Sequence, residues 1–287
     1  MQKDNRFCLI CKPKNRSLYY HQNEDKSVWL YCNKCNRGYS LRNYLNIAGV
    51  TPEEFLQGDL KFEDSKSNEV RAMAWPSSFI TMSDPRANKG VEYVKSRGLT
   101  LDGDMYYDLE DEGIVFPYYF ENQFCGAQVR FIQERIKEDG DKWKITTLPG
   151  TKLSLLFYNW NQTNFMGNVK GIIVAEGAFN AMSINQSLNK MYGGLTKNPW
   201  RAIACSGSGV SSHHLETLKE LKDKGYKIIC ASDTDEAGGK MLVKLAEHES
   251  CTHWALVDEK GKDWNDMLKQ LGHAEFAKYF ISRITPV

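Results

Sequence analysis

Short apolar runs alternate with amphipathic segments in the C-terminal part of the chain, from residue 170 onward. Continuous apolar runs bounded by turn residues predict buried strands, and segments with apolar residues at helical spacing predict helices between them. Strands that alternate with helices are typical of an α/β fold with a mainly parallel sheet. The expected strands cover residues 171–175, 202–205, 226–231 and 254–257.

Acidic residues follow three of these four expected strands. Glu176 follows the first, and Asp233 and Asp235 follow the third. Asp263 and Asp266 follow the fourth. The carboxyl ends of parallel strands meet at one sheet edge, where ligands bind, and carboxylate oxygens are preferred ligands of Mg²⁺ and Mn²⁺. The pattern predicts a divalent-cation site there, while helix capping is the alternative interpretation of an Asp at a strand end.

The middle of the chain, residues 76–169, contains β-prone stretches rich in aromatic residues. Two of them, 113–120 and 124–131, flank a turn at Asn122 and predict a pair of antiparallel strands. The remaining expected elements are a helix that starts near Val91 and ends at Gly98, and strands at 142–145 and 155–157. We therefore expect a mixed α+β subdomain ahead of the α/β domain.

Four cysteines lie within the first 35 residues as two Cys-x-x-Cys pairs. Cys8 and Cys11 form one pair, and Cys32 and Cys35 form the other after twenty intervening residues. Each pair can direct two thiolates at one metal ion, and four sulfur ligands complete the closed tetrahedral site of a structural zinc ion. The sequence therefore predicts one structural zinc ion.

The segment between the two cysteine pairs contains two β-prone stretches, 17–21 and 27–31, which predict a small β-rich zinc ribbon. Basic and aromatic residues are interleaved around it, a composition that suits single-stranded nucleic acid through phosphate contact and base stacking. Packing in a small core is the alternative role of the aromatics. The expected DNA-binding side chains are Lys14, Arg16, Lys34 and Arg37.

Composition and charge fit this division. The chain has 287 residues, 41% hydrophobic and 25% charged, which suits a soluble protein of more than one domain. No apolar run approaches the about 18 residues of a membrane span, and the polar start lacks a signal-peptide core, so we expect a cytoplasmic protein that contacts no membrane. The net charge of +1 conceals a balance of +6 in residues 1–50 and −5 in residues 51–170, and therefore does not exclude a nucleic-acid partner.

The expected domains are a zinc-binding domain over 1–56, a linker over 57–75, a basic subdomain over 76–169 and an α/β domain over 170–287.

The acidic residues lie in three short motifs, Val174-Ala175-Glu176-Gly177, Asp233-Thr234-Asp235-Glu236-Ala237-Gly238 and Lys262-Asp263-Trp264-Asn265-Asp266. Through these motifs, residues 170–270 resemble the toprim domain of DnaG-type and phage primases, type IA topoisomerases and related nucleases. With the cysteine pairs in front, the chain resembles a phage-type DNA primase over nearly its whole length. The resemblance implies a toprim catalytic domain with a Rossmann-like parallel sheet.

The resemblance also implies roles for the acidic residues. Glu176 would be the general acid/base or metal-linked glutamate, together with Asp233 and Asp235 as catalytic residues, and Asp263 would complete the ligands of Mg²⁺ or Mn²⁺. This sequence departs from the family at one position. Family members often have Asp three or four residues beyond the first Glu, where this chain has Asn180.

Primases carry a basic subdomain just ahead of the toprim region, and the middle segment is similar to it. The resemblance implies that four basic side chains contact the template or the incoming triphosphate. Solvated strand faces are the alternative, because acidic residues such as Glu134 lie close by in the sequence. The four side chains are Arg130, Lys142, Lys144 and Lys152.

The resemblance implies an enzyme that synthesises short RNA primers from NTPs on a single-stranded DNA template. Because the chain ends shortly after the toprim region, we expect a DnaB-like replicative helicase as a separate partner, and the compact architecture suggests a bacteriophage protein in the host cytoplasm. Two alternatives remain. One is a toprim nuclease that uses the same acids, and the other, which Asn180 favours, is a non-catalytic zinc-dependent DNA-binding or helicase-loading protein.

Overall fold

The structure, a computed structural model, describes residues 2–3, 18–22, 28–32, 37–40, 70–101, 105–136, 142–160, 168–206 and 209–287. The chain divides into two compact units, Met1–Glu69 and Val70–Val287. Among the residues that the structure describes, no helix is both long and apolar enough to cross a membrane.

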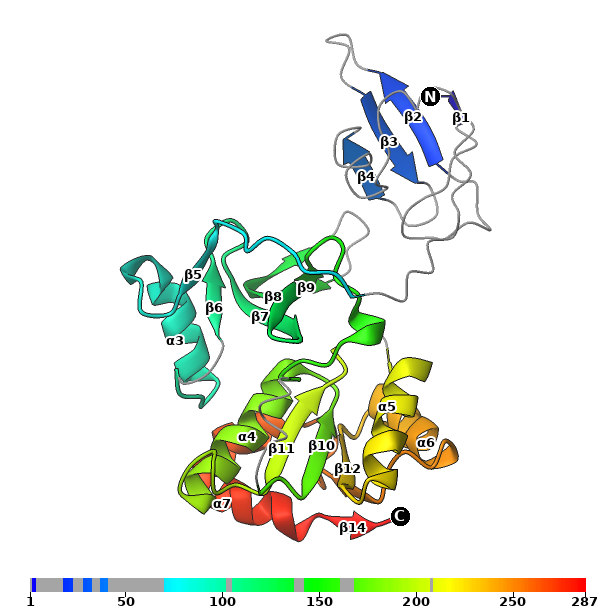
Figure 1. The fold of residues 1–287 in the computed structure, drawn as a ribbon. Coiled ribbons are helices and arrows are strands. Elements are labelled where there is room, and N and C mark those ends of the chain that lie inside the picture. Colours follow the sequence, from blue (N-terminus) through cyan, green and yellow to red (C-terminus); the bar gives the residue numbers. More distant parts are fainter. Residues whose placement is uncertain are drawn as a thin grey trace. The chain divides into compact units, whose positions relative to one another are not determined.

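The first unit contains a four-stranded antiparallel sheet in the order β1-β2-β3-β4 (Figure 1). Strands β2 and β3 correspond to the expected ribbon, with Tyr20 opposite Leu30, and Leu30 is fully buried. The strands are β1 (Gln2–Lys3), β2 (Leu18–Gln22), β3 (Val28–Cys32) and β4 (Arg37–Ser40).

Only part of the predicted zinc and DNA-binding set falls on these strands. Cys32 ends β3, and Arg37 begins β4 directly opposite it. The other predicted residues lie outside the described residues, so the zinc site and its DNA contacts remain predictions. Those residues are Cys8, Cys11, Cys35, Lys14, Arg16 and Lys34.

The second unit begins with a five-stranded antiparallel meander in the order β5-β6-β7-β8-β9. The expected pair of central strands is confirmed as β7 and β8, and Glu121 and Asn122 form the turn between them with left-handed φ values of 48° and 62°. The elements are β5 (Phe79–Thr81), η1 (Pro85–Ala87), α3 (Asn88–Ser96), β6 (Tyr106–Asp108), β7 (Gly113–Phe120), β8 (Gln123–Ile136) and β9 (Lys142–Thr147).

The expected strand at 155–157 is wrong. A short 3-10 helix, η2 (Leu153–Leu155), occupies its start, and the following residues form only an isolated bridge between Tyr158 and Ala204. Leu156 and Phe157 are buried in two different hydrophobic clusters. The apolar run therefore reflects packing of a connecting segment, which periodicity in a short run cannot separate from a strand.

A second five-stranded sheet follows, in the order β11-β10-β12-β13-β14. Its first four strands are parallel, as expected, and β14 pairs antiparallel with β13 at the edge. The elements are β10 (Gly171–Ala175), α4 (Ala178–Tyr192), β11 (Trp200–Ala204), α5 (Ser212–Asp223), β12 (Lys227–Ser232), α6 (Glu236–Glu247), β13 (His253–Leu256), α7 (Trp264–Ser282) and β14 (Thr285–Pro286).

The apolar strands of this sheet are covered on both faces. In β10, Ile173 and Ala175 pack in the cluster that includes α4 and α7, whereas Ile172 and Val174 pack in the cluster that includes α5 and α6. Figure 1 shows α4 and α7 on one side of the sheet and α5 and α6 on the other. Burial on both faces explains why these strands are continuous apolar runs without alternation.

The meander and the parallel sheet share one hydrophobic core. Val94 of α3 and Phe116 of β7 belong to the same cluster as residues of α4 and α7. Thr100 donates its backbone N–H to Gln186 Oε1 over 2.9 Å and accepts from Gln186 Nε2 over 2.9 Å, which fixes the segment after α3 on α4. Helix α3 is therefore held against the same helices that line the parallel sheet.

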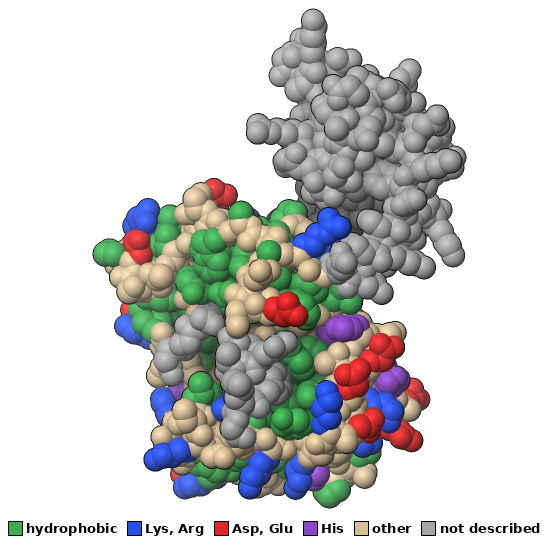
Figure 2. All heavy atoms as spheres, viewed as in Figure 1, with side chains coloured by type: hydrophobic (Ala, Val, Ile, Leu, Met, Phe, Trp, Pro, Cys, Tyr) green, Lys and Arg blue, Asp and Glu red, His purple; other side chains and the backbone are tan. Residues whose placement is uncertain are grey.

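The other face of the meander carries an aromatic cluster. Trp75 contacts the rings of Phe79, Tyr106 and Phe124 edge-on, and Met73 donates a backbone hydrogen bond of 2.7 Å to Phe124. Figure 2 shows hydrophobic side chains gathered over this part of the unit. Residues 70–75, the end of the expected linker, thus pack on the meander, while residues 57–69 lie outside the described residues.

Candidate active site

Three strand-to-helix connections bring the predicted acidic residues to one edge of the parallel sheet. Glu176 follows β10 directly, and Asp233 follows β12, its parallel neighbour. Asp235 is the N-cap of α6, and Asp263 is the N-cap of α7. Because all three connections leave the carboxyl ends of their strands, the fold delivers the four carboxylates to the same side of the sheet.

Asp235 and Asp263 are helix caps in this conformation. Asp235 Oδ1 accepts from the backbone N–H of Gly238 over 2.9 Å, and Asp263 Oδ1 accepts from that of Asp266 over 2.7 Å. Each carboxylate satisfies an N–H that the helix leaves unpaired and lies at the positive end of the helix dipole. The predicted helix-capping role is thus confirmed for Asp235 and Asp263, and one oxygen of each side chain serves it.

Glu176 and Asp233 lie in direct contact across the sheet edge. Glu176 Oε1 accepts from the backbone N–H of Asp233 over 3.3 Å. Gly238, in the first turn of α6, packs closely against both residues. A Cβ at this position would lie 2.1 Å from Asp233 O and 2.6 Å from Glu176 Oε1. Only a residue without a side chain allows α6 to start so close to the two acids.

Asn180, the third residue of α4, faces Asp233. Its Nδ2 lies 3.0 Å from Asp233 Oδ1 and 3.2 Å from Oδ2, so the amide donates to the carboxylate. Family members often have an Asp near this position, which would add negative charge beside Asp233. Asn180 instead places a hydrogen-bond donor there.

Burial and nearby negative charges raise the pKa values of three carboxyl groups, those of Glu176, Asp233 and Asp263. Burial, reinforced by the charges of Glu176, Asp263 and Asp235, raises the pKa of Asp233 to about 8, and the hydrogen bond from Asn180 opposes this shift. Burial is also the main cause that raises the pKa values of Glu176 and Asp263. An anionic cluster that is costly to ionise by itself is stabilised by a cation, which favours the charged forms.

The donor set suits Mg²⁺ or Mn²⁺, because the connections bring hard carboxylate oxygens to one edge of the sheet. In the part of the chain that the structure describes, however, no three His, Cys, Asp or Glu side chains are drawn together closely enough to hold an ion. The fold therefore brings the acids to one edge of the sheet without placing three of them at the spacing of a metal site.

The predicted basic residues lie on the meander and just beyond it. Lys142 and Lys144 of β9 both pair with Glu134 over 3.1 Å, and the two lysine side chains are 71% and 46% exposed. This pairing agrees with the solvated-face interpretation for these two lysines. Arg130 of β8 is half-buried and its Nε, which is buried, has no hydrogen-bond partner among the described residues, whereas Lys152 is exposed just before η2.

Sequence reasoning missed two residues beside the acidic edge. Arg97, just after α3, donates from Nη1 to Asn265 Oδ1 over 3.1 Å, and its charge lowers the pKa of Asp263 in opposition to burial. Asn265 lies within a quoted motif and could have been singled out for its place between two acids. No signal in the sequence connects it with Arg97, which lies 168 positions earlier.

Comparison with protein families matches residues 173–268 to the Toprim-like family. This segment contains every acidic residue of the edge described above. Residues 173–268 form a Toprim-like domain. The resemblance of the sequence to toprim proteins is therefore confirmed over the part of the chain that carries the three motifs.

Two solved structures show that the fold extends beyond the Toprim-like domain. The zinc-binding and RNA polymerase domains of Aquifex aeolicus primase match with a TM-score of 0.51 and 14% identity, covering 94% of this chain and 80% of that one. The E. coli primase catalytic core matches with a TM-score of 0.50 and 15% identity, covering 72% of this chain and 76% of that one. The chain thus has a DnaG-like primase fold. Comparison with curated protein sequences finds no match.

Proposed function

We propose that the protein is a DNA primase that synthesises short RNA primers on single-stranded DNA for replication. The observation that carries this proposal is the acidic edge of a Toprim-like domain packed in one core with a primase-like meander. The Aquifex aeolicus and E. coli proteins of this fold are named as primases. The chain would be a DNA-directed RNA polymerase with NTPs as substrates.

The acidic edge would hold Mg²⁺ or Mn²⁺ through Glu176, Asp233, Asp235 and Asp263. A bound cation there supplies charge neutralisation for the nucleotide triphosphate. The raised pKa values of Glu176, Asp233 and Asp263 support this assignment, because they report carboxylates whose ionised forms need a positive partner.

In the reaction, the 3′-hydroxyl of one nucleotide attacks the α-phosphorus of the next. A new P–O bond forms, the bond to the β-phosphate bridging oxygen breaks, and pyrophosphate leaves. Glu176, which lies at the strand end beside Asp233, would accept the hydroxyl proton. Most of the rate enhancement would come from positioning and charge stabilisation.

The meander would contact template and nucleotide phosphates. Arg130 is the best supported of the four basic residues, because its Nε has no hydrogen-bond partner among the described residues and a phosphate oxygen would supply one. Lys152 is exposed and could reach a ligand directly, whereas Lys142 and Lys144 would exchange Glu134 for phosphate.

The first unit would bind one structural zinc ion through Cys8, Cys11, Cys32 and Cys35 and hold the template. The fold of the Aquifex aeolicus match, which includes a zinc-binding domain, supports this role. Lys14, Arg16, Lys34 and Arg37 would contact the DNA. We further propose a phage-encoded protein of the host cytoplasm that cooperates with a separate DnaB-like helicase.

The test is an incubation of the protein with Mg²⁺ or Mn²⁺, labelled NTPs and random single-stranded DNA. We expect short RNA products that disappear in Asp233→Ala and persist in Asp223→Ala, a matched exposed aspartate on α5. Both variants are compared with the parent by thermal unfolding. Loss of the DNA itself would instead indicate a toprim nuclease, and DNA binding with neither product would indicate a helicase loader.

A further inference from the structure

Two buried asparagines lie behind the acidic edge and are bonded to each other. Asn180 on α4 is 5% exposed, and Asn265 in the first turn of α7 is fully buried. The backbone N–H of Asn265 donates to Asn180 Oδ1 over 3.2 Å, while Asn180 Nδ2 donates to both oxygens of Asp233. Both polar atoms of the Asn180 side chain are therefore used within the protein.

The orientation of the Asn180 amide follows from its partners. A backbone N–H can only donate, so the atom that meets Asn265 must be the oxygen, and the nitrogen then faces the carboxylate of Asp233. A rotation of the amide by half a turn would place donor against donor and oxygen against carboxylate. Asn180 thus fixes the direction of Asp233 as long as α7 fixes Asn180.

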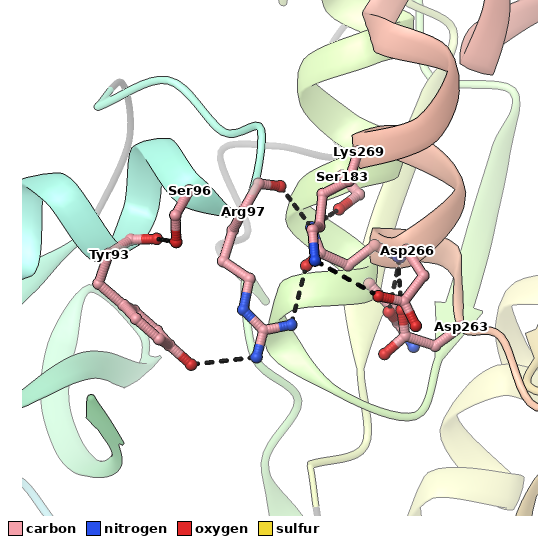
Figure 3. A network of polar contacts seen from close by, with 9 residues as sticks. Tyr93, Ser96, Arg97, Ser183, Asp263, Asp266 and Lys269 are labelled. Carbon is pink, nitrogen blue, oxygen red and sulfur yellow. Dashed lines mark hydrogen bonds and ion pairs between the residues drawn. The ribbon is translucent and has the colours of Figure 1, made fainter. Parts of the chain in front are cut away.

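The side chain of Asn265 continues the network away from the acids. Its Nδ2 donates over 2.9 Å to both the backbone carbonyl of Arg97 and Ser183 Oγ. Its Oδ1 accepts from Arg97 Nη1 over 3.1 Å. Figure 3 shows Arg97 reaching from the end of α3 toward the start of α7, where Asp263 and Asp266 lie.

Arg97 is itself held on several sides. Its Nη2 donates to the hydroxyl of Tyr93 over 3.0 Å, and the guanidinium lies 5.4 Å from the Tyr93 ring centroid and 5.0 Å from that of Phe179. The chain beyond it is fixed by the reciprocal bonds between Thr100 and Gln186. A planar guanidinium that lies near two aromatic rings and makes two directed hydrogen bonds is held in one orientation.

We propose that Arg97 and Asn265 are positioning residues that, through Asn180, hold the Asp233 carboxylate in place for cation binding. Arg97 lies outside the Toprim-like segment 173–268, so this network makes the acidic edge depend on the meander subdomain. The inference rests on the proposed function only in that the edge binds a divalent cation. It does not depend on which reaction follows.

The sign of the effect separates positioning from simple charge. Arg97 is a cation near Asp263, and by charge alone its removal would strengthen the binding of another cation. If Arg97 instead orients Asp233, its removal weakens cation binding. Arg97→Met removes the charge and both hydrogen bonds while keeping an apolar stem against Tyr93 and Phe179, so the fold is minimally disturbed.

The experiment measures the dissociation constant of Mn²⁺ for the full chain by electron paramagnetic resonance of the free ion, without nucleotide or DNA. We expect Arg97→Met and Asn180→Ala each to weaken Mn²⁺ binding by about tenfold, the scale typical of residues that orient metal ligands. The double variant should bind no more weakly than Asn180→Ala alone, because both changes remove one network. The zinc content of every sample is measured, so that differences in Mn²⁺ binding are compared between proteins that carry the same amount of zinc.

Two variants serve as matched controls. Arg135→Met removes an arginine of the same subdomain that pairs with Asp111 and stacks on Phe131. Asn185→Ala removes a hydrogen-bonded asparagine from the same helix as Asn180, one that binds the backbone of Ala202 in β11. Both should leave Mn²⁺ binding within twofold of the parent, and thermal unfolding verifies that all variants fold.

A further variant, Arg97→Lys, keeps the charge but cannot donate from two nitrogens to both partners, and we expect it to weaken Mn²⁺ binding as well. Unchanged or tighter Mn²⁺ binding in Arg97→Met, parent-like binding in Arg97→Lys, or additive losses in the double variant would each overturn the proposal. If the variants change Mn²⁺ binding as expected but the parent protein synthesises no RNA, only the proposed function is overturned. If Arg97→Met does not fold, Arg97→Lys decides the question.

Discussion

At the scale of single residues, Asp233 shows how the local environment changes a side chain's chemistry. It lies between Glu176, which accepts its backbone N–H, and Asn180, which donates to its carboxylate. Burial and three nearby acids favour its protonated form, and the amide of Asn180 favours the ionised form. The first influence is the stronger, since the pKa of Asp233 rises to about 8.

This pKa predicts how stability depends on pH in the absence of divalent cations. Between pH values of about 4 and 8 the folded state retains a proton on Asp233 that the unfolded state releases. The free energy of unfolding should therefore fall as the pH rises through this range, by at most about 1.4 kcal/mol per pH unit for one proton. Urea unfolding in EDTA at a series of pH values measures the slope.

Asp233→Asn should flatten that slope and leave the protein more stable than the parent at pH 8 without cations, because a neutral amide replaces a repelled carboxylate. Asp223→Asn on α5 is the control and should keep the parental slope. An Asp233→Asn variant with the same slope as the parent would contradict the assignment of the raised pKa to this residue.

At the scale of elements, the starts of α6 and α7 shape the site. Asp235 and Asp263 cap these helices, and Gly238 lets α6 approach Asp233 and Glu176. These features are local, and the Asp-x-Asp pattern with its following glycines indicated both the turn and the helix start. The sequence could not indicate which of the two glycines lies against the acids. Gly238 approaches Glu176, which lies 62 positions earlier in the chain.

Gly238→Ala should damage the site, because the new Cβ would collide with the backbone oxygen of Asp233 and with Glu176 Oε1. We expect a loss of about 1–3 kcal/mol in unfolding free energy, together with weaker Mn²⁺ binding. Gly239→Ala is the matched control. Apart from the backbone of α6 itself, no atom of the described residues lies within 4 Å of a Cβ there, and replacing a helical glycine should stabilise the protein by about 0.5–1 kcal/mol.

Chemical unfolding and Mn²⁺ titration of the two alanine variants test this pair. A Gly238→Ala protein as stable as Gly239→Ala, with parental Mn²⁺ binding, would show that α6 can move away from the acids without cost.

At the scale of the whole molecule, the chain divides into two compact units, for which we expect different sources of stability. The second has a core that joins α3 and β7 to α4 and α7, whereas the first is expected to depend on zinc. This division predicts that losing the metal affects one unit only.

Cys32→Ser should release the zinc ion, because a closed structural site needs all four ligands. We expect elemental mass spectrometry to show a loss of about one zinc ion per chain. The second unit should unfold at the parental urea concentration, since the described residues of its core all lie within Val70–Val287. Primer synthesis on single-stranded DNA should weaken because template binding is lost. The control is Cys125→Ser, which changes a buried free thiol of the second unit. This variant should contain as much zinc as the parent protein.

Full primer synthesis by a zinc-free Cys32→Ser protein would contradict the role proposed for the first unit. A change in the unfolding of the second unit in that variant would show that the two units depend on each other energetically.

The sequence by itself determined the α/β alternation, the central strands of the meander and the order of the acidic residues. These features follow from hydrophobic periodicity and from turn and cap residues, which act over a few positions along the chain. The same local reasoning failed for residues 155–157, because a short apolar run gives the same pattern in a buried connection as in a strand.

Only the tertiary structure decided which side chains support the acids. The sequence showed Asn180 as a departure from the family, but the fold turns its amide toward Asp233 and its oxygen toward the start of α7. The fold also brings Arg97 from α3 to Asn265. Such contacts depend on how helices from different subdomains pack in a common core. Local sequence patterns span only a few positions, so they cannot indicate a contact between residues 168 positions apart.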